Sequence, residues 1–544
     1  MKSSALLRGA AGLDADDGVA VGSDVGKNAQ VVKLVCEVGV HRGLAEHAGG
    51  SHHDNGHAVC GTVDSLGGAD GLLAAGDVLD NDVCAVDLEA VNESAGGDIG
   101  RGACGGGADE GDGVAGGVAL GLGAGLGSDG FLCGSGVGGS GVGGCGLFCG
   151  SGGVEKKDIL MLFSNGLHPR TGREEARKIL GDELFGEFYP TNQITSHDSE
   201  DYDALVDLGC TARGDRVIMN KAVFEADLAI LIGHTQGNPY GGYSGGYKHC
   251  ATGITHWRSI AAHHNTSVMH RADYTPVSGH SLMRSKFDEI GMFMEEKMGR
   301  KFFCCDAVLD TLSRQIAVFS GYAKEMMPVS WQVADRRTYV EWAEKKYDIM
   351  VFGMPQDFHY GNGMGTNPIQ MMQALSAQII RHKRVLKDNC VIICSSVCNG
   401  YFHDERWPYA RELYEMFQHD YMNTLPYMER YGELFATNEE YIRKYRFGGA
   451  FHPFHGFSMM SCGHIAEMNT AAIYIVGAQE PGIARGMGLK TRASFEEALA
   501  DAMKKFTGPE PNILALPQTF KLGAVHLCMK GQHYDGTNGC AQEE

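Results

Sequence analysis

The chain changes composition abruptly near residue 155, and this change limits which part of it can fold. Residues 1–155 hold 42 of the 78 glycines, no Pro, Tyr or Trp, and a single Ile. They carry 6 Lys and Arg against 21 Asp and Glu, so they account for −15 of the formal net charge of −21. Because so few large apolar side chains cannot form a hydrophobic core, we expect the folded part to begin near residue 156.

Residues 1–155 allow three interpretations: a disordered acidic tail, a flexible linker, or a translation from a wrong reading frame or start. Authentic disordered segments usually contain Pro, and this one has none, which favours the last interpretation. We therefore expect these residues to be disordered or not a native domain.

The bulk properties predict a cytoplasmic protein. The first eight residues carry charge without the apolar stretch of a signal peptide, and no segment approaches the ~20 apolar residues of a membrane span. The cysteines of 302–305 and 390–394 stand in apolar runs, which is typical of reduced, buried thiols. The acidic balance argues against nucleic acid as a partner, and the sequence leaves the oligomeric state open.

From residue 156 the chain alternates short apolar runs with longer amphipathic ones, which predicts an α/β protein. A helix is expected from Gly172 to Leu180, with Thr171 and Glu174 as its capping box, and another over 255–263. We expect two α/β domains, 156–280 and 281–500, with a ligand site between them and a C-terminal extension over 501–544. The other expected strands are 158–163, 228–232, 349–352, 390–394 and 472–476, and the other helices are 368–383 and 409–418.

The glycine-rich loop 241–248 follows the apolar run 228–233 and ends at Lys248. Glycines after a strand allow backbone N–H groups to approach an anion, and a lysine there can reach a phosphate or form a covalent bond. The spacing is neither that of a Walker A loop nor that of the dinucleotide fingerprint. It predicts a less common ligand site.

Several histidines stand near predicted strand or helix ends. His168, in the loop after strand 158–163, is either a general base or a loop histidine that bonds backbone. His263 and His264 are either metal ligands or helix-end residues. His234 and Asn238 either face a ligand or shape the turn before the glycine-rich loop. The spacing of Cys390, Cys394 and Cys398 does not match a zinc ribbon, and 452–457 is either a pocket wall or a capped turn.

Taken in order, these pieces resemble the lactate racemase family, whose enzymes use a nickel-pincer nucleotide. The resemblance covers about 157–500. The matching segments are 166–170 (Gly-Leu-His-Pro-Arg), His197-Asp198, 208–227 around Thr211 and Arg213-Gly214, 242–248 (Gly-Tyr-Ser-Gly-Gly-Tyr-Lys), His264-Asn265 sixteen residues after Lys248, and 353–357 (Gly-Met-Pro-Gln-Asp).

The resemblance implies a racemase or epimerase of a 2-hydroxy acid. His264 would be the protein ligand of nickel, and His168 one of two acid–base histidines. Tyr243, Ser244, Gly245, Gly246 and Lys248 would bind the cofactor, with the N–H groups of the loop receiving its phosphate. The cofactor takes up the hydride, so the protein contributes placement and proton handling.

The chain departs from the family in two places. Asn238 stands where the second acid–base histidine is expected, and an amide is no base near pH 7, so His234 or a histidine of 452–464 is expected to replace it. The substrate is then expected to differ from lactate. The family's N-terminal half-domain, with its carboxylate-binding arginine, has no counterpart in 1–155, so an unpaired sheet edge is expected.

Two alternatives stay open beside the racemase. One is a truncated or non-catalytic family member that binds a nucleotide-like ligand, which the missing half-domain and Asn238 favour. The other is a zinc hydrolase built on the histidines and cysteines, although their spacings match no known zinc site.

Overall fold

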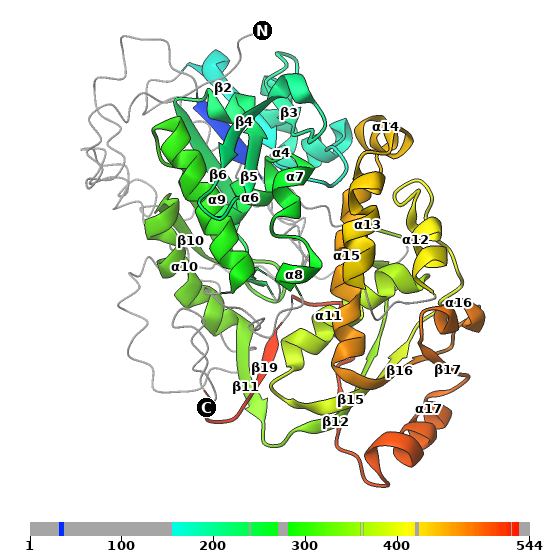
Figure 1. Ribbon diagram of the computed structural model, residues 1–544. Coiled ribbons are helices and arrows are strands. Elements are labelled where there is room, and N and C mark those ends of the chain that lie inside the picture. The colour runs from blue at the N-terminus through cyan, green and yellow to red at the C-terminus, as the bar shows by residue number, and fades with distance from the viewer. Residues whose placement is uncertain are drawn as a thin grey trace.

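The computed structural model describes residues 32–36, 155–238, 241–269, 281–358, 361–362, 364–418, 424–523 and 525–532. These residues form two α/β lobes joined by two chain segments (Figure 1). The predicted α/β class is confirmed. Of residues 1–154 only β1 (Val32–Cys36) is described, so the other expectations for that segment lie outside the described residues.

The first lobe is built on a sheet in the order β1-β6-β9-β10. β1 pairs in parallel with β6, with Val32 opposite Leu228, at the edge that the sequence predicts to be unpaired. β6 pairs in parallel with β9, and β10 returns antiparallel. The bounds are β6 Leu228–His234, β9 Phe303–Leu309 and β10 Gln315–Tyr322; β2 (Ile159–Phe163) pairs with β3 (Ile194–Ser196), and β4 (Leu205–Cys210) with β5 (Arg216–Asn220).

Two helices of the first lobe do not begin or end as predicted, because local hydrogen bonds set their boundaries. Helix α4 (Arg173–Phe188) begins after Gly172, whose N–H donates to the Glu175 carboxylate, so the predicted Thr171 and Glu174 capping box is wrong. The predicted helix 255–263 shortens to α7 (Trp257–Ala261), capped by His256. The other helices are α5 (Lys221–Phe224), α6 (Tyr247–Gly253), α8 (Thr266–Met269), α9 (Leu282–Met298) and α10 (Ala323–Thr338).

The second lobe holds a five-stranded parallel sheet in the order β17-β16-β15-β12-β18. Its central strands carry continuous apolar runs, as expected for a parallel sheet with both faces covered. The predicted strands 349–352, 390–394 and 472–476 are confirmed within β12 (Tyr347–Gly353), β15 (Leu386–Ser395) and β16 (Thr470–Val476). β17 is Lys490–Arg492 and β18 is Ile513–Ala515.

Helices cover the second sheet. Two of them, α11 and α12, match the predicted helices 368–383 and 409–418. α11 (Pro368–His382) begins after Asn367, whose side chain accepts the Gln370 N–H, and Pro368 fills the first turn. α15 (Pro453–Met468) packs along α11. The others are α12 (Ala410–Phe417), α13 (Thr424–Ala436), α14 (Glu439–Gly448), α16 (Pro481–Gly486) and α17 (Phe495–Ala502).

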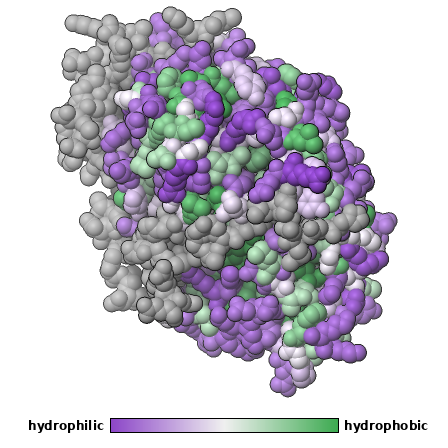
Figure 2. Space-filling view, in the orientation of Figure 1, coloured by the Kyte–Doolittle hydropathy of each residue, from purple (hydrophilic) through white to green (hydrophobic). Residues whose placement is uncertain are grey.

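The chain crosses between the lobes at a two-stranded parallel pair. β11 (Tyr339–Ala343) leaves the first lobe after α10, and β19 (His526–Met529) returns beside it. The domain boundary near 280 stays a prediction, although β9 and β10, which follow it, pair with β6. On the face shown in Figure 2, hydrophilic residues cover most of the described surface and hydrophobic residues form separate patches. None of the described helices has the length and apolar character needed to cross a lipid bilayer.

Candidate functional site

The side chains at the start of the glycine-rich loop are used to hold the loop itself. The Ser244 hydroxyl donates to the His234 carbonyl (2.9 Å) and accepts the Gln236 N–H (2.9 Å). The Tyr243 ring is fully buried and stacks on Trp331, with ring centroids 4.4 Å apart. These two predicted cofactor residues therefore tie the loop to the end of β6 and to α10.

The two central glycines of the loop are required by its geometry. Gly245 and Gly246 have φ of 78° and 56°, which favours glycine. A Cβ at Gly246 would lie 2.2 Å from the Met327 sulfur, and one at Gly245 would lie 2.5 Å from the Asp306 carboxylate. The Asp306 carboxylate also accepts the Gly246 N–H (2.8 Å) and contacts His249 Nε2 (2.9 Å).

The expectation that the N–H groups of this loop receive a phosphate finds little support. The N–H of Gly246 is bonded to Asp306, and those of Ser244, Lys248 and His249 are bonded to backbone carbonyls. Helix α6 that follows is only seven residues long. The loop therefore acts first as a scaffold that places Lys248.

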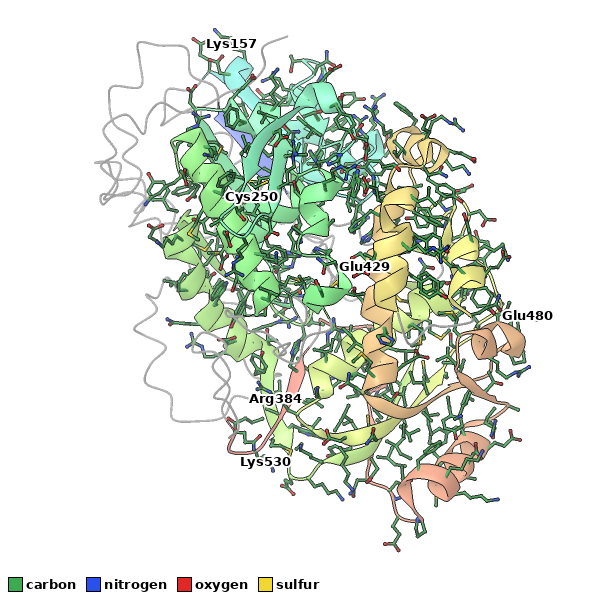
Figure 3. All side chains as sticks on the ribbon, in the orientation of Figure 1. Lys157, Cys250, Arg384, Glu429, Glu480 and Lys530 are labelled. Atoms are coloured by element: carbon green, nitrogen blue, oxygen red, sulfur yellow. The ribbon has the colours of Figure 1, made fainter. Side chains whose placement is uncertain are left out.

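Lys248 is 1% exposed and lies in the first turn of α6. Its positive charge lowers the pKa of both His263 and His264, although burial is the larger cause for each. The charge of Lys248 therefore acts on both imidazoles. Figure 3 labels Cys250, two residues on, in the interior of the first lobe.

His263 and His264 form a hydrogen-bonded pair whose tautomers follow from their partners. His263 Nε2 faces the Ala251 carbonyl (3.2 Å), which only accepts, so this nitrogen carries the proton. Burial lowers the pKa of His263 to about 3, so its Nδ1 is an unprotonated acceptor. The Nδ1 of His264 lies 2.6 Å from it and must donate. Since burial also keeps His264 neutral, its Nε2 has a lone pair.

His168 meets two rings of the second lobe. Its ring centroid lies 4.8 Å from that of Phe451 and 5.0 Å from that of His455, in the first turn of α15. Burial lowers the pKa of His455 to about 3, and the charge of His264 is a further cause. His455 therefore packs against His168, and the charge of His264 acts on it. We call His168, His263, His264 and His455 the histidine group.

A buried network joins the two lobes beside the histidine group. His452 Nε2 donates to the Glu200 carboxylate (2.8 Å), while its Nδ1 accepts the Phe454 N–H (3.1 Å). The His452 N–H donates to the carbonyl of Leu167, the neighbour of His168. The Tyr445 hydroxyl donates to the Gly166 carbonyl (2.9 Å) and accepts the Ser199 N–H (3.2 Å). These bonds fix the loop that carries His168 against the start of α15.

Comparison with known proteins finds relatives that are similar to part of this chain. A family model described as the lactate racemase N-terminal domain matches residues 150–275. The lactate racemase of Lactiplantibacillus plantarum is 26% identical over 163 residues, which are 30% of this chain and 37% of that protein. The lactate racemase of Thermoanaerobacterium thermosaccharolyticum is 23% identical over 168 residues, 31% and 38% of the two chains. Residues 150–275 are therefore similar to the lactate racemase N-terminal domain.

The fold of this chain agrees with a solved structure. The lactate racemase apoprotein of Thermoanaerobacterium thermosaccharolyticum superposes with a TM-score of 0.51 at 18% identity, over 71% of this chain and 82% of that chain. In sequence, the chain spans less than two fifths of the length of the two lactate racemases above.

The structure brings some predicted site residues together and gives others local contacts. His168 and His264 both lie near His455, and Lys248 lies near His264. The Asn238 side chain accepts the Gly241 N–H (2.6 Å), a contact that shapes the turn, and His234 is buried at the end of β6. The catalytic, cofactor and metal roles of these residues stay predictions.

The structure also tests the thiols and adds residues that no motif indicated. Cys390, Cys394 and Cys398 are buried and free, as predicted. Among the described residues, no three His, Cys, Asp or Glu side chains are grouped as a metal site. The sequence analysis did not identify three of these residues, because their hydrogen-bond partners lie 60 to 279 residues away: Glu200, Asp306 and Tyr445. Asp198, in contrast, stood in a recognised pair, and it binds Arg446 (2.9 Å).

Proposed function

We propose that the chain is a racemase or epimerase of a 2-hydroxy acid that works with a nickel-pincer nucleotide. The relationship to lactate racemases supports the reaction class. The observation that supports the cofactor is the 2.6 Å contact between the Nδ1 atoms of His263 and His264, which leaves the His264 Nε2 available to a metal. Metal-binding histidines commonly donate their second ring N–H to a neighbouring acceptor in this way.

Two residues have the chemistry that the cofactor requires, His264 as a metal ligand and Lys248 as a cation. A neutral imidazole is a good nickel ligand, and burial keeps His264 neutral. Lys248, buried beside it, would hold the nucleotide by its charge or through a covalent link. When bound, the group supplies the acceptor for the hydride of the substrate α-carbon. The backbone N–H groups of the glycine-rich loop are assigned no phosphate, since most are bonded within the protein.

His168 would handle the substrate proton. As the α-carbon loses hydride, the hydroxyl loses its proton to the imidazole, and a planar 2-keto acid forms. Return of hydride to the opposite face, with return of the proton, gives the other enantiomer. The aromatic rings of Phe451 and Trp407, stacked 4.1 Å apart, line this side of the site and help to exclude water.

The test loads the purified chain with the nickel nucleotide and measures the nickel retained after gel filtration, together with interconversion of pure 2-hydroxy acid enantiomers. The wild type should retain nickel, His264→Ala should lose most of it, and Lys248→Ala should lose the nucleotide. Lys387→Ala is the matched control, because Lys387 pairs with Asp348 on the second lobe. Wild-type nickel retention by His264→Ala would overturn the assignment.

A non-catalytic chain that binds a nucleotide-like ligand is the second candidate. It is favoured by Asn238, which stands where the resemblance expects a second acid–base histidine and whose side chain accepts the Gly241 N–H. The same experiment separates the two: retained nickel nucleotide without turnover of any 2-hydroxy acid supports the binding protein. Racemisation of one such acid rejects it.

A further inference from the structure

The crossing between the two lobes holds buried polar side chains that the proposed function does not use. β19 begins at His526, which lies opposite Tyr339 of β11, with the two ring centroids 5.4 Å apart. α11 ends at His382 and packs against β19. Both imidazoles are 1% exposed, and a charge on His382 lowers the pKa of His526. The last turn of a second-lobe helix and the first residue of the returning strand therefore come together at two buried histidines.

The polar atoms of this cluster have no hydrogen-bond partner in the part of the chain that the structure describes. This holds for both ring nitrogens of His382, for both of His526 and for the Nε2 of Gln378. Gln378 lies one turn before His382 on the same face of α11, and its Oε1 accepts the Thr519 hydroxyl (2.7 Å). Buried polar groups without partners are costly and rare, so several of them in one place indicate a ligand.

Three arginines place positive charge around His526. Burial lowers the pKa of His526 well below its usual value, and the charges of Arg381, Arg384 and Arg337 lower it further. The Arg384 Nη1 lies 4.0 Å from the Cys528 sulfur, so this guanidinium reaches β19 at the lobe crossing (Figure 3). The ligand of this cluster therefore meets a positive field.

The sign of the charge indicates an anion and argues against a metal ion. Among the described residues, every charge that acts on His382 or on His526 is positive, and positive charges repel a metal ion. The carboxylate that acts on Arg337 is that of Asp310, which also binds Arg314 (2.7 Å). The carboxylate is thus shared with a second arginine.

The two imidazoles are neutral donors and acceptors. Burial, with a further contribution from Arg381, lowers the pKa of His382 to about 3, and that of His526 is also far below neutral pH. A neutral imidazole offers one N–H and one lone pair. Hydrogen phosphate matches both, because its oxygens accept hydrogen bonds and its hydroxyl donates one. The amide of Gln378 adds a further donor.

We propose that the lobe crossing binds one small free oxyanion, hydrogen phosphate by its chemistry, between His382, His526 and Gln378. The site shares no residue with the candidate functional site, so this inference goes beyond the proposed function and does not depend on it. Gln378 is 0% exposed, like the histidines almost fully covered, which suits a free ion better than a phosphoryl group on a larger molecule. A bound ion would join α11 to β19 and so stabilise the folded chain.

The experiment titrates the full chain, without added cofactor, with inorganic phosphate. Isothermal titration calorimetry should show one phosphate bound per chain, and the urea midpoint should rise with phosphate until the site is full. Sodium chloride of equal ionic strength is the reference and should give no saturable rise. His526→Phe keeps a ring beside Tyr339 but loses both nitrogens, so phosphate affinity should fall at least about tenfold. His382→Leu should weaken binding similarly.

Lys530→Ala is the matched control, because Lys530 follows β19 on the surface and pairs with Glu344 (2.6 Å). It should bind phosphate as the wild type does. Wild-type affinity in both His526→Phe and His382→Leu would overturn the site. A wild type that binds no phosphate would also overturn it, since water would then satisfy these nitrogens. If His526→Phe does not fold, His382→Leu decides alone.

Phenyl phosphate tests whether the site takes a free ion, because it carries the same phosphoryl group on a bulky ring. It should show no binding that His526→Phe abolishes. Phenyl phosphate that binds as tightly as phosphate, and is lost in His526→Phe, would overturn the assignment to a free oxyanion. Racemisation enters none of these measurements, so failure of this site and failure of the proposed function are distinguishable.

Discussion

The glycine-rich loop and the histidine group are assembled in opposite ways. The loop is one continuous stretch whose side chains and N–H groups bond mostly to nearby residues, to α10 and to Asp306. The histidine group gathers residues from three separate segments, and His455 meets His168 only when the two lobes pack. Changes in the loop should therefore affect folding first, and changes around the histidine group should affect proton handling and lobe contact.

The largest expected effect is acid instability at the lobe contact, which holds several buried neutral histidines. Burial lowers the pKa of His197 to about 4 and those of His256 and His455 to about 3. The unfolded chain takes up protons below about pH 6.5, while the folded chain resists protonation until about pH 3 to 4. Stability should be complete above pH 6.5 and fall by about 1.4 kcal/mol per pH unit per histidine as pH drops.

Urea unfolding at pH 7.5, 6.5, 5.5 and 4.5 measures this slope. His382→Leu should flatten the slope by one proton, because burial lowers the His382 pKa to about 3. Among the described residues no group bonds either nitrogen of its ring, so the substitution removes no hydrogen bond. A flat profile between pH 6.5 and 4.5 in the wild type would contradict neutral, buried histidines.

The next effect tests the loop as a scaffold. Gly246→Ala places a methyl group 2.2 Å from the Met327 sulfur at a φ of 56°, so we expect a loss of about 3 kcal/mol or more. Gly299→Ala is the matched control, because Gly299 has a φ of 67° in the left-handed region and nothing within 4 Å of the added atom. It should cost only about 1 kcal/mol of backbone strain. Equal losses would mean that the close packing of the loop is unimportant.

This contrast also shows what the sequence can and cannot predict. The apolar runs of β12, β15 and β16 and the start of α11 at Pro368 are local signals, and the structure confirms all of them. The glycine-rich loop was found for the same reason. Its backbone bonds to Asp306 were not foreseen, because that partner lies 60 residues farther along the chain.

The missed part of the site depends on how the lobes pack. His455 stood in a segment that read equally as a pocket wall or a capped turn, and its ring meets His168 across 287 positions of sequence. Glu200 and His452 are 252 residues apart. No periodicity or spacing links such residues, so only the fold brings them together.

The smallest expected loss of stability comes from removing one hydroxyl group at the contact between the lobes. Tyr445 is fully buried, and its hydroxyl joins the Gly166 carbonyl to the Ser199 N–H. Tyr445→Phe leaves both backbone groups without this partner, so we expect a loss of about 1–3 kcal/mol in urea unfolding. The turnover of both enantiomers should fall equally, because the loop of His168 then loses a contact with the second lobe.

Tyr474→Phe is the control for that loss. Its hydroxyl donates to Asp501 (2.8 Å), which keeps Arg492 and Lys505 as partners after the substitution. The control should therefore cost less than about 1 kcal/mol and leave both enantiomers unaffected. If the two tyrosine variants lose equal stability and turnover, the hydroxyl at the lobe contact has no special part in holding His168. The Tyr445 hydroxyl would then give no support to the idea that packing of the two lobes holds the histidine group in place.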